Sequence, residues 1–179
     1  MNLKKERIKI AKDVIKHLFD ERMKVETGNY CRIDSPIYYE SGTELQSLLY
    51  KVTCKVCALG AAMLSHVRLH DNFKLRHALM HKVHNDIHDT EINYELEKYF
   101  TKTQLGLIEV AFESRMGLYF RSLDYTYWSK TRDQILAQEG YKIGMVRKAA
   151  EFGSGFSSDM ERLRAIMQNI IDNDGHFCP

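Results

Sequence analysis

The chain has 179 residues, of which 44% are hydrophobic and 28% charged, and its formal net charge is +2. This composition excludes a disordered chain, and the small net charge excludes an overall field strong enough to attract nucleic acid or an anionic membrane. We expect residues 1–179 to form a single domain, because this length is sufficient to bury a core. Only two prolines occur, and since proline disrupts helices, an α-rich fold is favoured.

The first predicted element is an amphipathic helix near the N-terminus. Its apolar positions recur at helical spacing, namely Ile8, Ala11, Val14, Ile15 and Leu18. Lysines follow an adjacent stripe, namely Lys5, Lys9, Lys12 and Lys16, which we interpret as an ordinary solvent-facing surface. Gly28 is the expected C-terminal cap. Residues 29–42 are rich in turn formers and predict a loop, with a short extended piece at 30–33.

Small side chains dominate the next stretch, which we expect to be a helix from Cys54 to His70. Five of its residues are no larger than alanine or a thiol, namely Cys57, Ala58, Gly60, Ala61 and Ala62. Such residues let backbones approach closely, so this helix is predicted to lie in the core. Another helix should begin before it at the capping box of residues 41–44, and a third is predicted over residues 73–88.

Two more capping boxes predict helices in the second half of the chain. Residues 101–104 should open a helix with Leu105, Ile108, Ala111 and Phe112 facing inward. A helix is predicted over residues 143–152. Residues 158–161 should open the last helix, which ends near Gly175 and faces inward through Met160, Leu163, Ile166, Met167, Ile170 and Ile171. The sequence therefore predicts a mainly α fold of about seven to eight helices, with at most a short strand pair.

Four histidines recur at the spacing of one helical stripe, namely His77, His81, His84 and His88. Histidines four residues apart can share a metal ion, and Asp86, Asp89, His66 or His70 are candidate further ligands. One hypothesis is therefore a zinc or iron site on His77, His81 and His84, in a metal-binding protein or a hydrolase. We prefer the interpretation as a polar stripe, because the glutamate of the zinc protease motif is absent from His77-Ala-Leu-Met-His81.

The cysteines offer a second candidate zinc site. Cys54 and Cys57 form one Cys-x-x-Cys pair, which His176 and Cys178 would complete if the C-terminus folds back. A second well-spaced pair is missing from the sequence. We therefore favour buried, unreactive thiols for this pair.

No motif for a reaction stands out in the sequence. A phosphate-binding P-loop, a Gly-x-Ser-x-Gly elbow and a dinucleotide fingerprint are all missing, so we assign no catalytic residue and no cofactor and expect a protein that is not an enzyme. Four basic residues near Tyr141, namely Arg147, Lys148, Arg162 and Arg164, leave a nucleotide- or nucleic-acid-binding module as an alternative.

Two segments are candidate contact surfaces for a partner. One is aromatic, with Tyr119, Phe120, Tyr125, Tyr127 and Trp128, and the other is acidic, with Asp86, Asp89 and Glu91. The apolar runs are too short to span a membrane, and no apolar signal core follows the basic N-terminus. We therefore expect a cytoplasmic protein without a membrane partner.

The segment Val56-Cys-Ala-Leu-Gly-Ala61 and the ending from Arg162 to Pro179 resemble segments of uncharacterised small proteins of bacteriophages and their hosts. The first is similar to the Cys-Ala-Leu-Gly-Ala core of a domain of unknown function. This resemblance implies an accessory protein in the host cell cytoplasm that binds a host macromolecule, most often a protein, and inhibits it; a bacterial defence system is one such target. It implies no catalytic residue.

Overall fold

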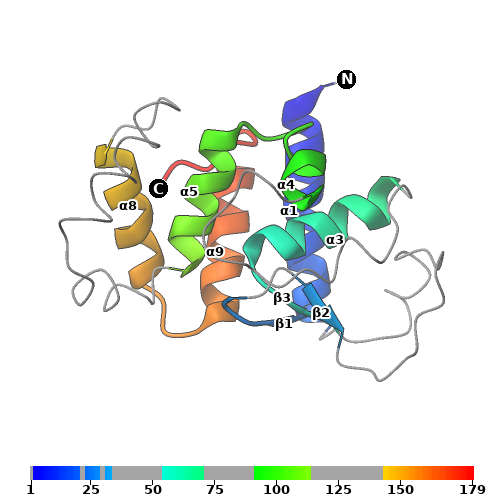
Figure 1. Cartoon of the computed structure of the whole chain (residues 1–179), viewed down its shortest axis with the longest axis horizontal. Coiled ribbons are helices and arrows are strands. Elements are labelled where there is room, and N and C mark those ends of the chain that lie inside the picture. The colour runs from blue at the N-terminus through cyan, green and yellow to red at the C-terminus, as the bar shows by residue number, and fades with distance from the viewer. Residues whose placement is uncertain (1, 21–22, 29–30, 34–53, 71–90, 114–142) are drawn as a thin grey trace.

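The computed structural model describes residues 2–20, 23–28, 31–33, 54–70, 91–113 and 143–179. Within these ranges the chain forms six helices and one small sheet (Figure 1), which confirms the predicted mainly α fold. The capping box at 41–44, the helix predicted over 73–88 and most of the aromatic segment 117–144 lie outside these ranges. No helix in the described ranges has both the length and the apolar character to cross a membrane.

Helix α1 (Leu3–Phe19) begins at Asn2, whose side-chain oxygen accepts a hydrogen bond from the backbone N–H of Lys5 at 3.3 Å. Its buried face consists of Arg7, Ile10, Ala11, Val14, His17 and Leu18. This face is rotated slightly from the predicted apolar stripe, so Ile8 and Ile15 lie half-buried at its edge.

A three-stranded sheet lies at one end of the helices (Figure 1). Its strands are β1 (Met23–Val25), β2 (Cys31–Ile33) and β3 (Cys54–Val56), in the order β1-β3-β2. β3 pairs parallel with β1 and antiparallel with β2. β2 confirms the extended piece predicted at residues 30–33. The sheet has three strands, one more than the short strand pair that the sequence predicted at most.

Two predictions next to the sheet are wrong. Gly28 does not cap α1, because β1 intervenes; Gly28 lies in the turn after that strand, with φ +87°. The helix predicted from Cys54 begins four residues later, at Ala58, because residues 54–56 form the central strand. Backbone pairing on both sides and the β-branched Val56 favour the extended conformation there.

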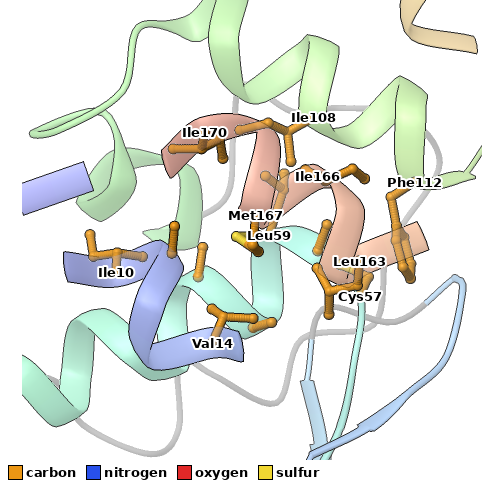
Figure 2. Packing of buried hydrophobic residues seen from close by; sticks show 14 of the residues in the cluster. Ile10, Val14, Cys57, Leu59, Ile108, Phe112, Leu163, Ile166, Met167 and Ile170 are labelled. Atoms are coloured by element: carbon orange, nitrogen blue, oxygen red, sulfur yellow. The ribbon is translucent and has the colours of Figure 1, made fainter. Parts of the chain in front are cut away.

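Helix α3 (Ala58–His70) runs through the core. Every residue from Ala58 to Val67 is buried, which confirms the central prediction for this stretch. Because its first turns carry alanine and glycine, α1, α5 and the short α4 (Glu91–Leu96) all pack against it. Figure 2 shows Leu59 of α3 among core side chains from the neighbouring helices.

Helix α5 (Lys102–Glu113) starts as predicted, with the Thr101 hydroxyl accepting the Gln104 backbone N–H at 3.2 Å. Its predicted inward residues, Leu105, Ile108, Ala111 and Phe112, are all buried. Helix α8 (Ile143–Ser154) packs against α5 and extends two residues beyond its predicted end.

Helix α9 (Asp159–Asp172) has both hydrogen bonds of the predicted capping box between Ser158 and Glu161. It runs antiparallel to α1, since Lys4 at the start of α1 lies 2.7 Å from the Asp174 carboxylate just beyond the end of α9. The two helices share a large part of the core (Figure 2).

Two side chains of α9 differ from what the sequence predicted. Met160 was expected to face inward, but it is 53% exposed, because the buried face of α9 starts at Arg162. Arg162 was assigned to a basic region near Tyr141 that could bind nucleic acid, but it is fully buried. Its guanidinium donates to the carbonyl oxygens of Gly153 and Phe112, both at 2.8 Å, and these lie at the C-terminal ends of α8 and α5. It thereby satisfies carbonyl groups that the helices leave without an internal donor.

Candidate functional site

Most of the predicted site residues lie outside the described ranges and stay predictions. These are His77, His81, His84, His88, Asp86, Asp89, Tyr119, Phe120, Tyr125, Tyr127 and Trp128. Glu91 is the first residue of α4, and its side chain is not described. Two other features of the described residues are candidate sites: an exposed basic stripe on α1 and a partly buried cluster of histidines and glutamates.

The α1 stripe consists of Lys5, Lys9, Lys12, Lys16 and Phe19, all of them exposed. The residues are spaced by four, three, four and three positions, so they fall within about 80° of each other around the helix axis. The buried face of α1 lies on the opposite side. The stripe is therefore a continuous outer surface of the helix.

The acidic residues of α1 turn away from this stripe towards α3. The Asp13 carboxylate accepts two hydrogen bonds from the Arg68 guanidinium, at 2.7 and 3.0 Å. The Glu6 carboxylate lies 3.4 Å from the His70 ring and accepts a hydrogen bond from Lys9 at 2.7 Å. Lys5, Lys12 and Lys16 make no ion pair with any residue of the described ranges. The stripe therefore presents positive charge with little local compensation.

An aromatic ring stands at the C-terminal end of the stripe. Phe19 is 64% exposed, and the Arg164 guanidinium of α9 lies 4.9 Å from its ring centroid. Met160 lies one turn before Arg164 on the same helix and is also exposed. Phenylalanine, methionine and arginine are the residue types enriched where proteins bind partners.

The amino-acid sequence carries a local signal for this surface that the lysine stripe alone does not reveal. Phe19 follows Lys16 by three positions and so continues the lysine spacing, which places a ring at the end of the polar stripe. The proximity of Arg164 to Phe19 depends on the antiparallel pairing of α1 with α9, and no local pattern predicts that pairing.

The second feature, the histidine cluster, consists of His66, His70, Tyr99, Glu6 and Glu95, contributed by α1, α3, α4 and the turn after α4. The His66 ring lies 3.6 Å from the Glu95 carboxylate, and the His70 ring lies 3.4 Å from that of Glu6. Tyr99 stacks on His70 with ring centroids 5.6 Å apart and lies 5.1 Å from His66. The cluster joins three helices through ionisable groups.

Burial controls the electrostatics of this cluster. It lowers the pKa of His66 below its ordinary value, with a further contribution from the neighbouring His70, and it raises the pKa of the Tyr99 hydroxyl. A hydrogen bond from Lys9 lowers the pKa of Glu6. No residue of the described ranges forms a hydrogen bond with three buried atoms of the cluster, namely His66 Nδ1, His70 Nε2 and Glu6 Oε2, the last two of which lie 3.4 Å apart.

The described residues hold no group of three or more histidine, cysteine, aspartate or glutamate side chains arranged to bind a metal ion. Histidine side chains such as those of the cluster gain and lose protons near neutral pH. The C-terminal tail packs onto the helices, where its backbone binds Gln104 of α5 and Asn169 of α9. Cys57 is buried, whereas Cys178 is exposed.

No protein-family model matches the chain, and neither the curated proteins nor the solved structures contain a match.

Proposed function

We propose that the protein acts by binding, and that its α1 stripe contacts a negatively charged macromolecule together with Met160 and Arg164. The observation that carries this proposal is the exposed Phe19 ring, which lies beside Arg164 at the C-terminal end of the lysines of the α1 stripe. Lysines spread along a helix attract an anionic partner and orient it, while covering a phenylalanine ring contributes about 1.5–3 kcal/mol of binding free energy.

The resemblance of residues 56–61 and 162–179 to phage proteins suggests the setting for this activity. In that setting the partner is a host macromolecule, and binding inhibits it, for example as a component of a bacterial defence system. The charged surface supports the proposal, since a protein that blocks a host factor needs a surface and no active site.

The test is affinity purification of the immobilised chain from a bacterial lysate, followed by mass spectrometry of what it retains. A surface variant carries Lys12→Glu, Lys16→Glu and Phe19→Ser. We expect the wild-type chain to retain a partner that this variant loses. The experiment is run on lysate with and without nuclease, which separates a protein partner from a nucleic acid.

The matched control carries equivalent changes elsewhere, namely Arg147→Glu, Lys148→Glu and Tyr94→Ser. These residues are exposed on α8 and α4. The control should retain the same partner as the wild type. Identical retention by the wild type and the surface variant, in both lysates, would rule out the α1 stripe as the binding surface.

A further inference from the structure

Given the binding function proposed above, we infer that the partner of the α1 stripe is single-stranded nucleic acid. Its phosphates contact the lysines and one base stacks on Phe19. Three properties of the surface carry this inference: its single sign of charge, the spacing of its lysines, and the aromatic ring at its end.

The sign of the charge comes from how α1 is built into the fold. Asp13 is engaged by Arg68 of α3, and Glu6 lies against His70 of the same helix. Glu6 also pairs with Lys9 of the stripe at 2.7 Å, so the uncompensated positive charge comes from Lys5, Lys12 and Lys16, which point outward. Although the whole chain carries a net charge of only +2, one side of one helix is strongly cationic.

The spacing of the lysines matches a repeating anion. Lys5 and Lys16 are separated by about 16 Å along the helix axis, and adjacent lysines by about 4.5 to 6 Å. Long flexible stems let each ammonium group reach a separate phosphate of an extended strand. A protein partner is a poorer match, since lysine is depleted from protein interfaces and their buried centres are apolar.

The ring at the end of the stripe favours a single strand over a duplex. Proteins that bind single strands combine a cationic track with aromatic side chains on which unpaired bases stack. Phe19 is mostly exposed, and the Arg164 guanidinium beside it offers a second flat cationic surface. The stripe otherwise carries only lysines, so it has no asparagine or glutamine with which to read base edges in a duplex groove.

The experiment measures the binding of a fluorescently labelled twelve-nucleotide oligo-dT by anisotropy at several salt concentrations. Phosphate contacts from Lys5, Lys12 and Lys16, the three lysines without an ion pair in the described residues, predict that log K falls with log salt concentration with a slope of about −2. The double variant Lys12→Gln, Lys16→Gln should reduce the slope to about −0.7, since two of the three contacts are lost. Phe19→Ala should weaken binding about 5- to 150-fold and leave the slope unchanged.

The control variant is Arg147→Gln, Lys148→Gln, which removes two charges from α8 in the basic region that the sequence offers as an alternative nucleic-acid site. Helices α5 and α9 separate α8 from α1 (Figure 1), so binding at the α1 stripe predicts that this control binds like the wild type, whereas binding at the alternative site predicts that it loses affinity. Equal losses of affinity in the control and in the stripe variant would overturn the inference. So would tighter binding of a duplex of the same sequence, or a Phe19→Ala variant that binds like the wild type.

The inference and the proposed function can fail separately. If oligo-dT does not bind at 50 mM salt but the surface variant still loses a protein partner from nuclease-treated lysate, the α1 stripe is a binding surface and its partner is an acidic protein. In that case only the inference is wrong. If neither oligo-dT binding nor partner retention depends on the stripe, both are wrong.

Discussion

The side-chain amide of Gln104 pairs with both backbone groups of Phe177. Its Oε1 accepts the Phe177 N–H at 2.5 Å, and its Nε2 donates to the Phe177 carbonyl oxygen at 3.1 Å. Asn169 repeats this arrangement on Cys178, at 2.8 and 2.9 Å. The two side-chain amides thus hydrogen-bond the backbone N–H and carbonyl groups of the tail, as an adjacent strand does in a sheet. The Phe177 ring is fully buried and edge-on to Phe152, so the tail completes the core.

This arrangement predicts that the tail contributes strongly to stability. Phe177→Ala should lower the free energy of unfolding by about 3–5 kcal/mol, because it leaves a cavity. Gln104→Ala should cost less, about 1–3 kcal/mol, since it leaves two backbone groups without their partner. Urea denaturation measures both, with the exposed Met160→Ala as a control that changes stability by less than about 0.5 kcal/mol. An unchanged urea midpoint after deletion of residues 176–179 would contradict this account.

The buried Arg162 predicts a sharp difference between two arginines of α9. Arg162→Lys should lower the free energy of unfolding by about 1–3 kcal/mol, because one ammonium group cannot replace the planar fork that binds both Gly153 and Phe112. Arg164→Lys changes an exposed residue and should have little effect. Thermal unfolding of the two variants tests this pair. Equal melting temperatures for the two variants would show that the buried contacts contribute nothing.

The sequence was sufficient to predict most described helices because their signals are local. The capping box of Ser158 and Glu161 fixed the start of α9, and Thr101 fixed that of α5. The strand β3 was missed because it is stabilised by pairing with residues 23–25 and 31–33, which lie more than 20 positions away. Periodicity within residues 54–70 carries no information about those partners.

Of the two candidate sites, one could be predicted from local sequence patterns and the other could not. The four lysines of the α1 stripe are visible in the sequence, and Phe19 extends their spacing. The histidine cluster is not visible, because tertiary packing brings Glu6, Glu95 and Tyr99 to the histidines of α3. Burial of Arg162 was likewise unpredictable, since its partners are carbonyl groups at the ends of two other helices.

Two glycines with positive φ give a test of backbone contact. Both Gly28 and Gly175 adopt φ values, +87° and +84°, at which alanine is strained by about 1–2 kcal/mol. A Cβ atom on Gly28 meets nothing within 4 Å, whereas one on Gly175 would lie 2.9 Å from the Lys4 carbonyl oxygen. Gly175→Ala should therefore destabilise the protein clearly more than Gly28→Ala in urea denaturation. Equal losses would mean that the end of α9 does not press against α1.

The pKa shifts of the buried histidines predict how stability depends on pH. Burial lowers the pKa of His66 and of His17 below the ordinary value of about 6.5, so the unfolded chain binds protons more readily than the folded one. Their contribution to stability is complete above pH 6.5 and is lost as the pH falls through 6.5 towards their folded pKa values. The pKa of Glu6 and that of Glu161 are also lowered, by hydrogen bonds from Lys9 and Ser157, and their contributions are lost only below about pH 4.5.

Urea denaturation at half-unit steps from pH 8 to pH 4 should therefore show a first decline beginning near pH 6.5 and a second below about pH 4.5. His66→Gln removes one titrating group, so it should make the first decline of the free energy of unfolding shallower. At pH 8 the histidine is neutral in both states, so any difference in stability between the variant and the wild type at that pH measures the loss of packing alone. The carboxylate variant Glu161→Gln should leave the first decline unchanged, because its group titrates at lower pH. A free energy of unfolding that stays constant between pH 7 and pH 5 would mean that burial does not lower the pKa of His66 and His17.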